Sequence, residues 1–187
     1  IFPEQKEMTK DDFVIICGDF GGIWCQEDNR KALRNEDHWL DWLDKKPFTT
    51  LFVCGNHENF DRLSGFPVEN RYGGRVHVIR PSILHLMRGE TFHIDGKNVF
   101  AFGGASSHDI SDGILPRENW KEEARKLDRR GKYMYRIDGL SWWKEELPSD
   151  EEMQNGLANL ANAENHIDFI ITHSPPASVI ALLGFGS

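Results

Sequence analysis

Three short apolar runs along the chain each end in small or polar residues. The runs and the residues that follow them are 13–17 with Gly18-Asp19, 51–54 with Gly55-Asn56, and 169–171 with Thr172-His173. Continuous apolar runs of this length are typical of strands buried on both faces of a sheet. Because ligands in open α/β sheets gather at the carboxyl ends of strands, the pattern predicts a functional site where the three runs end.

The segment between the first two runs has the spacing of a helix. From Asn29 to Lys46, the apolar residues Leu33, Trp39, Leu40 and Leu43 recur at near-helical intervals, and the segment stops at Pro47. A strand, a helix and a second strand make a crossover unit, so we expect the first two strands to be parallel.

Two further patterns complete the predicted elements. Ser149 and Glu152 form a capping box that opens a helix before the third run. Asp95-Gly96, between apolar segments at 90–94 and 97–102, is a tight-hairpin signature. The chain is therefore predicted to be an α/β fold with parallel and antiparallel strands. Residues 108–140 show no clean period and are interpreted as an insertion.

Charge is distributed unevenly over the 187 residues, a length that suits one domain. The chain has 22 basic and 30 acidic residues, a net charge of −8. This balance argues against general nucleic-acid binding, and double-stranded DNA is not an expected partner. Residues 117–136 carry 8 basic and 4 acidic residues. They form either a solvated, charge-rich segment or a basic wall that attracts an anionic substrate.

Neither a membrane span nor a targeting signal is visible in this sequence. No apolar run approaches the roughly 18 residues that a span needs, and the first residues lack the layout of a signal peptide. Cys17, Cys25 and Cys54 are odd in number and lack zinc-finger spacing. Two of them lie in apolar runs, where a free thiol acts as a small hydrophobe. We therefore expect a reducing compartment and a cytoplasmic protein.

Candidate chemistry lies at the ends of the three runs. A carboxylate (Asp19), an amide (Asn56) and an imidazole (His173) suit a Mn, Fe or Zn site. Gly18 and Gly55 would let the main chain approach a phosphate or metal without a clash. The tryptophans are expected to be core and helix-packing residues; they are Trp39, Trp42, Trp142 and Trp143.

The ordered series Gly18-Asp19, Gly55-Asn56-His57-Glu58 and Thr172-His173 resembles the calcineurin-like metallophosphoesterase superfamily. The resemblance runs from about Phe13 to Pro176. It implies one domain over residues 1–187, with two mixed β-sheets in a sandwich flanked by helices. It also implies two divalent metal ions, Mn, Fe, Zn or Ni, with Asp19 bridging them and with Asn56 and His173 binding the second.

The same resemblance implies an activity. A hydroxide that bridges the metals would attack the phosphorus of a phosphomonoester or phosphodiester. Asp19 and His57 would be catalytic, and His57 would contact the phosphoryl group and protonate the leaving oxygen. His108, after a Gly-Ser-rich turn, is a further candidate for substrate binding at the rim of the site. Expected substrates are a phosphorylated small molecule, a nucleotide or a phosphoprotein.

Two motifs of the family pattern are missing. No Asp-x-His precedes Gly18, and no Gly-His-x-His follows His173. Half of a binuclear centre is therefore present, and we expect weak metal binding and poor turnover from this chain alone. A domain incomplete at both termini would explain this. The alternatives are a non-catalytic scaffold or interaction module with a degenerate phosphoesterase fold, and completion of the site by a partner chain.

Overall fold

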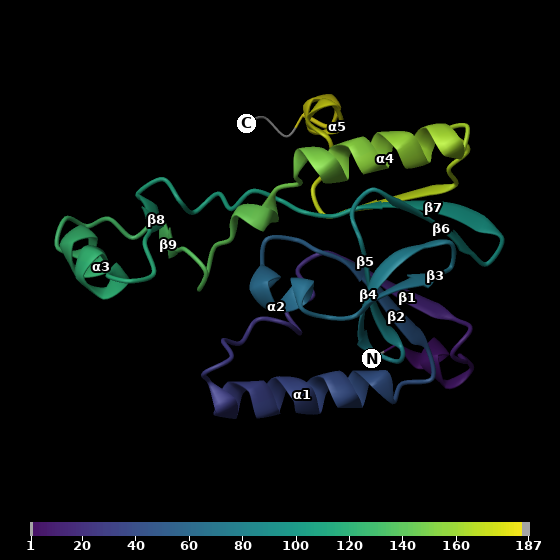
Figure 1. The fold of residues 1–187 in the computed structure, drawn as a ribbon, viewed down its shortest axis with the longest axis horizontal. Helices are drawn as coiled ribbons and strands as arrows, with labels where there is room; N and C mark the ends of the chain where they lie inside the picture. Colours follow the sequence, from purple (N-terminus) through teal and green to yellow (C-terminus); the bar gives the residue numbers. More distant parts are fainter. Residues whose placement is uncertain (1, 185–187) are drawn as a thin grey trace.

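The structure is a computed structural model that describes residues 2–184, and most of its strands form two facing mixed sheets (Figure 1). Sheet A has the order β1 (Phe13–Cys17), β2 (Thr49–Val53), β5 (Ile83–Leu86), β4 (Gly74–Arg80), β3 (Val68–Arg71). Sheet B has the order β10 (Phe169–Thr172), β7 (Lys97–Phe102), β6 (Glu90–Ile94). The α/β fold with two mixed sheets and flanking helices is confirmed.

Helices lie outside both sheets. α1 (Arg30–Asp44) and α2 (Phe60–Ser64) lie on sheet A, while α4 (Asp150–Asn162) lies along sheet B and α5 (Ala177–Leu182) follows β10 (Figure 1). Two short 3-10 helices are η1 (Pro3–Lys6) and η2 (Lys144–Glu146). Among the residues described, no helix combines the length and apolar character that crossing a bilayer requires.

The local predictions from the sequence are confirmed at the level of elements. β1 and β2 pair in parallel with Phe13 opposite Thr49, and α1 connects them. β6 and β7 form the antiparallel hairpin with Ile94 opposite Lys97. Both reciprocal hydrogen bonds of the Ser149–Glu152 capping box are present at the start of α4.

Full burial of the first and third runs was predicted wrongly, because β1 is only partly buried and β10 is exposed over its first two residues. β1 and β10 are edge strands, so each has one unpaired side within the described chain. In β10, Phe169 is 55 % and Ile170 is 65 % exposed, and Cys17 at the end of β1 is also exposed. A continuous apolar run identifies a strand, but it does not say whether that strand lies at the centre or at the edge of a sheet.

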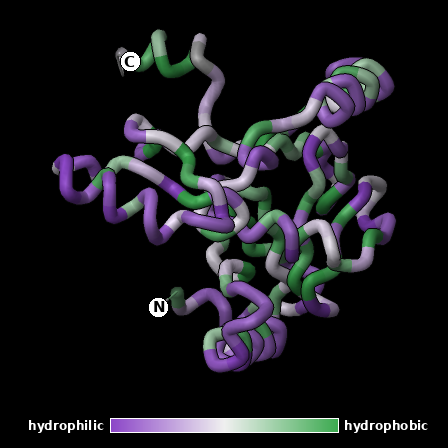
Figure 2. Tube along the Cα trace, turned by 60° about the vertical axis from the view of Figure 1, so that its left-hand side comes forward, coloured by the Kyte–Doolittle hydropathy of each residue, from purple (hydrophilic) through white to green (hydrophobic). Residues whose placement is uncertain are grey.

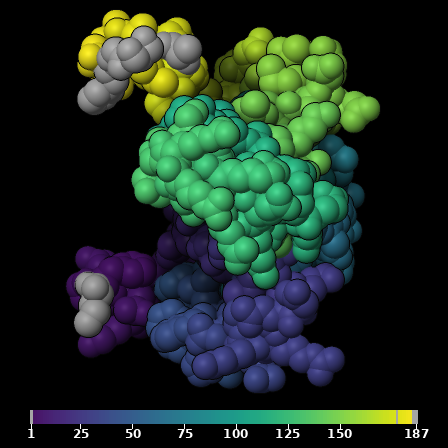
Figure 3. Space-filling view, turned by 90° about the vertical axis from the view of Figure 1, so that its left-hand side faces the viewer, coloured from purple at the N-terminus to yellow at the C-terminus, as the bar shows by residue number. Residues whose placement is uncertain are grey.

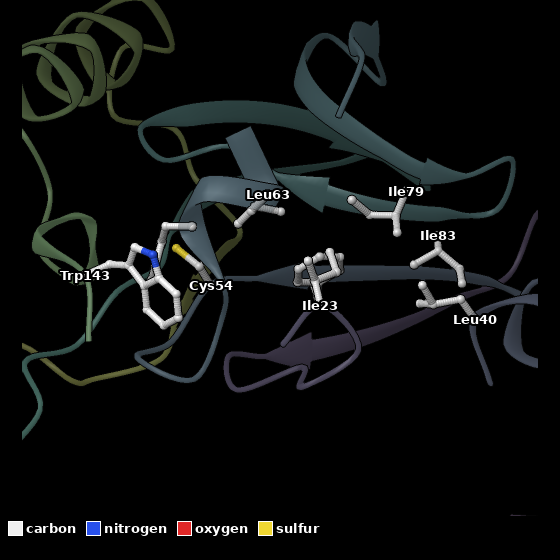
Figure 4. Close-up of a cluster of buried hydrophobic side chains, with 9 residues drawn as sticks. Ile23, Leu40, Cys54, Leu63, Ile79, Ile83 and Trp143 are labelled. Carbon is white, nitrogen blue, oxygen red and sulfur yellow. The ribbon is translucent and has the colours of Figure 1, made fainter. Parts of the chain in front are cut away.

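Two apolar clusters hold the layers together. One fills the space between the sheets, and its members are Leu51, Val53, Val76, Leu84, Leu86, Phe92, Ile94, Val99 and Ala101. The other lies under α1 and α2 and includes Cys54, Leu63 and Trp143 at one end and Leu40, Ile79 and Ile83 at the other (Figure 4). Figure 2 shows hydrophobic positions gathered in the central strands, whereas hydrophilic positions are frequent on the peripheral helices other than the largely hydrophobic α5. Both faces of sheet A are therefore covered.

The tryptophan prediction is correct for Trp143 and wrong for two residues of α1. Trp143 is buried, whereas Trp39 is 54 % and Trp42 is 49 % exposed. Glu36 and Leu40 are the buried residues of this helix. At about 100° per residue, Trp39 and Trp42 point roughly 100° and 160° away from Leu40. The apolar character of these two side chains therefore does not place them in the core.

Residues 108–140 contain more regular structure than their sequence predicts. β8 (Gly113–Leu115) and β9 (Tyr135–Ile137) pair in parallel, and α3 (Trp120–Asp128) connects them. We call residues 108–140 the arm. It extends sideways from the two sheets in Figure 1, and in Figure 3 its green atoms stand between the C-terminal helices and α1. The arm follows the loop after β7, and its residue Arg136 lies beside His57 in the loop after β2.

Candidate active site

Asp19 connects the ends of the first two strands. Its Oδ1 accepts hydrogen bonds from the backbone N–H groups of Asn56 and His57, each at 3.1 Å. Asp19 itself has a φ of +51°, in the left-handed region that Asp tolerates better than most residues. The carboxylate is thereby turned back over the loop that follows β2, and the two strand ends predicted to converge do so.

His173 approaches the same carboxylate from sheet B. Its Nδ1 lies 2.8 Å from the Cys17 carbonyl oxygen, and its Nε2 lies 3.5 Å from Asp19 Oδ1. A carbonyl can only accept, so Nδ1 carries the proton of this hydrogen bond, and Nε2 is the ring nitrogen that faces Asp19. Metal-binding histidines are commonly oriented in this way by a backbone carbonyl.

Glycine is required at two positions of this junction. A Cβ on Gly18 would overlap the imidazole of His173, and a Cβ on Gly55 would overlap the side chain of Asp19. Gly18 also has a φ of +95°, which only glycine adopts readily. The two glycines therefore let the side chains of His173 and Asp19 lie against the loops. Approach of the main chain to a phosphate or metal at these positions remains a prediction.

Asn56 is buried and held by a chain of polar contacts. Its Nδ2 donates to Ser107 Oγ at 3.1 Å, and Ser107 Oγ donates to Glu146 Oε1 at 2.9 Å. The Ser107 N–H donates to the other oxygen of Glu146 at 3.0 Å. With its amide nitrogen engaged, Asn56 presents its carbonyl oxygen as the group able to ligate a cation.

Glu58 is a buried carboxylate that holds two loops of the site together. The side chain is fully buried, and its two oxygens accept the N–H groups of Phe20 at 2.8 Å and Gly55 at 2.7 Å. Desolvation raises the pKa of Glu58 to about 7, against the lowering effect of those two hydrogen bonds. Glu58 thus fastens the loop after β1 to the loop after β2.

His57 is exposed and has two neighbours. Its ring stacks on Trp24 with 5.6 Å between centroids and 25° between planes. Its Nε2 lies 3.2 Å from Nη2 of Arg136, which belongs to the arm. The histidine proposed to act on the phosphoryl group therefore lies at the surface, beside the other candidates.

His108 is exposed and, within the described chain, forms no hydrogen bond or ring contact in the site. Its neighbours in sequence do reach the site: Ser107 binds Asn56, and Asp109 binds Arg136 at 2.7 Å. The assignment of His108 to substrate binding remains a prediction.

Several residues of the site were missed from the sequence. Ser107, Arg136 and Glu146 are far from the strand-end motifs in sequence and join them only in the folded chain. The one available signal was the Gly-Gly-Ala-Ser-Ser turn after β7, which lies at the carboxyl end of a strand like the other motifs.

The donor set fits one half of a hard or borderline cation site. Asp19, Asn56 and His173 supply a carboxylate, an amide oxygen and an imidazole nitrogen, which Mn, Fe and Zn accept. In residues 2–184, no group of three or more His, Cys, Asp or Glu side chains is arranged to hold a metal ion. Asp19, Asn56 and His173 therefore form an incomplete ligand set. Within the described residues, the additional ligands that a binuclear centre needs are not grouped with them.

Comparison with known proteins identifies a family. The model of the calcineurin-like phosphoesterase family matches residues 1–185. No solved structure gives a significant match.

Three curated relatives are named as lariat debranching enzymes. The Caenorhabditis briggsae protein is 25 % identical over 185 residues, which cover 94 % of this chain and 32 % of that protein. Lariat debranching enzyme A of Xenopus laevis is 27 % identical over 131 residues, 65 % of this chain and 23 % of that protein. The Danio rerio enzyme is 27 % identical over 119 residues, 59 % of this chain and 20 % of that protein. The chain spans at most about a third of these relatives.

Proposed function

This chain belongs to the calcineurin-like phosphoesterase family, and we propose that it carries half of a metal-dependent phosphoesterase site. The observation that supports the proposal is the convergence of Asp19, Asn56 and His173 from the ends of three strands in two different sheets. Families of this kind typically bind two metal ions. Asp19, Asn56 and His173 are the residues that would hold them in this chain.

Each residue of the site has a separate task in this proposal. Divalent cations, when bound, would supply the Lewis acidity that activates water for attack on phosphorus. Asp19 would contribute its carboxylate as a ligand. Asn56 and His173 are oriented in advance by Ser107 and by the Cys17 carbonyl, which lowers the entropic cost of ligation.

His57 would act on the substrate side. It is exposed, while Asp19 Oδ1 fixes its backbone, so the imidazole can contact a phosphoryl oxygen or the leaving oxygen. Proton transfer to a leaving oxygen by a positioned imidazole contributes typically 10²–10⁴-fold to rate.

Among the candidate substrates, we favour a phosphodiester of a nucleotide or oligonucleotide. The names of the three relatives support this choice over a phosphomonoester or a phosphoprotein. The basic residues of the arm also favour an anionic substrate. A cytoplasmic location, manganese as the metal, and phosphatase activity remain proposals of lower priority.

Hydrolysis of two model substrates tests the proposal. Bis(p-nitrophenyl) phosphate and p-nitrophenyl phosphate are incubated with Mn²⁺ and either this chain or the full natural polypeptide. We expect Asp19→Asn and His57→Ala to reduce hydrolysis of the diester by about 100-fold or more in the full polypeptide. Asp11→Asn and His38→Ala change exposed residues of the same types and should leave it unchanged. Wild-type rates in Asp19→Asn and His57→Ala would refute the proposal.

A second candidate is a non-catalytic interaction module with the same fold. It is favoured by the absence, in residues 2–184, of three convergent acidic, histidine or cysteine ligands. This alternative predicts that the full natural polypeptide also lacks an Asp-x-His and a Gly-His-x-His motif and hydrolyses neither substrate with Mn²⁺, Fe²⁺, Zn²⁺ or Ni²⁺.

A further inference from the structure

We infer that Arg136 is a positioning residue for His57, supplied to the active site by the arm. The inference rests on the proposed function, because it assigns Arg136 a role through the histidine placed on the substrate side. It goes beyond that function in giving the arm a task in the site itself.

Arg136 differs from every other basic residue of its segment. Of the 8 basic residues between 117 and 136, the other 7 are exposed, and Arg136 is 8 % exposed. Burial of a guanidinium is costly unless its N–H groups are satisfied. The general positive charge of the arm therefore does not explain why Arg136 is buried.

The guanidinium is anchored on two sides and faces His57 on the third. Nε donates to Asp109 Oδ1 at 2.7 Å, and Nη1 donates to the Ser141 carbonyl at 3.0 Å. Nη2 lies 3.2 Å from His57 Nε2. Since Asp109 and Ser141 precede and follow the strand that carries Arg136, the loops at the base of the arm fix the side chain before it reaches the histidine.

The direction of this last hydrogen bond follows from chemistry. A guanidinium has only donors, so His57 Nε2 must accept through its lone pair. A neutral His57 ring then carries its hydrogen on Nδ1. Arg136 thereby selects one of the two imidazole tautomers and turns Nε2 toward the base of the arm.

Trp24 restrains the same ring from its face. The stacked indole limits tilting of the imidazole ring, and the hydrogen bond to Arg136 limits rotation of the imidazole in its own plane. His57 is otherwise exposed, so without these two contacts its ring would sample several rotamers. A fixed imidazole raises the fraction of molecules in which the ring is placed for reaction, which acts on kcat.

The first test needs no turnover. Long-range ¹H–¹⁵N spectra of the histidine rings of this 187-residue chain report which nitrogen carries the hydrogen, and His57→Gln identifies the signal. We expect the Nδ1–H tautomer of neutral His57 in the wild type. In Arg136→Met its ratio to the other tautomer should fall about fivefold, the effect of one ordinary hydrogen bond. Arg136→Lys, which keeps a charged donor, should restore part of the ratio.

Two further variants separate this role from simple folding defects. Arg117→Met removes another arm arginine, which binds the Gly139 carbonyl and does not contact His57, and should leave the tautomer unchanged. Asp109→Asn weakens the anchor while it keeps Arg136, and should shift the ratio in the same direction as Arg136→Met. An unchanged His57 signal in folded Arg136→Met would overturn the inference.

Steady-state kinetics of the full natural polypeptide give the second test. Positioning predicts that Arg136→Met lowers kcat about tenfold and changes KM less than about twofold. A rise in KM alone would instead make Arg136 a substrate-binding residue and overturn the positioning role. Full activity of His57→Ala would refute the proposed function. The tautomer measurement on this chain needs no catalytic activity, so it would still report whether Arg136 orients His57.

Discussion

Glu58 shows how a single residue can join two loops at an energetic cost. Its carboxylate is fully removed from water and accepts two backbone N–H groups, from Phe20 and Gly55. Those bonds favour the charged form, but desolvation outweighs them and raises its pKa to about 7. The group is therefore easier to protonate in the folded chain than in the unfolded one.

A pH dependence of stability follows from this raised pKa. Between the usual value of 4.5 and about 7, the folded state binds more protons at Glu58 than the unfolded state does. The contribution to the free energy of unfolding is complete below pH 4.5 and is lost as the pH rises through 7, in total about 3 kcal/mol. Urea unfolding at pH 4.5, 6 and 8 measures it.

The control compares Glu58→Gln with Glu27→Gln, which alters an exposed loop residue. Glu58→Gln should remove the acidic gain in stability because the amide does not titrate. Glu27→Gln should keep the wild-type profile. Identical pH profiles in the wild type and Glu58→Gln would show that burial does not perturb this carboxyl.

At the scale of elements, the packing of α4 on sheet B depends on a pair of glycines. Gly156 is the buried residue of α4, and it faces Gly89, which precedes β6. A Cβ on Gly89 would lie 2.8 Å from the Glu152 carbonyl oxygen and 2.8 Å from the Gly156 nitrogen. Both are backbone atoms, so a change of side-chain rotamer cannot relieve the clash. Asn155 and Asn159 bind the Gly89 carbonyl and complete the contact.

Gly89→Ala should therefore destabilise the protein by about 3 kcal/mol or more, from both backbone strain and the displaced helix. Gly96→Ala is the matched control, because Gly96 has a similar φ (+70° against +76°) and nothing within 4 Å of its added Cβ. It should cost only the strain of about 1 kcal/mol. Equal midpoints of urea unfolding for the two variants would contradict the proposed helix contact.

At the scale of the whole molecule, the candidate active site lies where three parts of the chain meet. Asp19, Asn56 and His57 come from sheet A, His173 from sheet B, and Arg136 from the arm. The contact of His173 with Asp19 and with the Cys17 carbonyl links the edge strands of the two sheets. The geometry of the site thus depends on how the sheets are placed against each other.

The ligand set of the described residues predicts weak metal binding. With one carboxylate, one amide and one imidazole, we expect this chain to retain fewer than two Mn²⁺ per molecule after dialysis. Elemental analysis by mass spectrometry gives the ratio, and Asp19→Asn should lower it further, with Asp11→Asn as the exposed control. Two tightly retained metals per chain would contradict this expectation.

The sequence predicted the strands at the three apolar runs, the β6–β7 hairpin and the helices α1 and α4 in the right order, but it missed β3, β4, β5 and the elements of the arm. It was also less informative about burial. The runs at 13–17 and 169–171 are strands, yet both are edges, and Trp39 and Trp42 are exposed. Strand formation depends on local pattern, whereas burial depends on which other segments pack alongside. The charge count identified residues 117–136 as basic, but it did not distinguish Arg136 from the seven exposed basic residues of the same segment.

What the sequence determined by itself is the family and the three strand-end motifs. Glycine and polar residues directly after apolar runs are local features, and a local pattern can be read without the fold. The tertiary structure decided that Ser107 holds Asn56, that Glu58 is buried, and that Arg136 reaches His57 across 79 positions. Contacts between distant segments arise from the packing of sheets and arm, which no short stretch of sequence specifies.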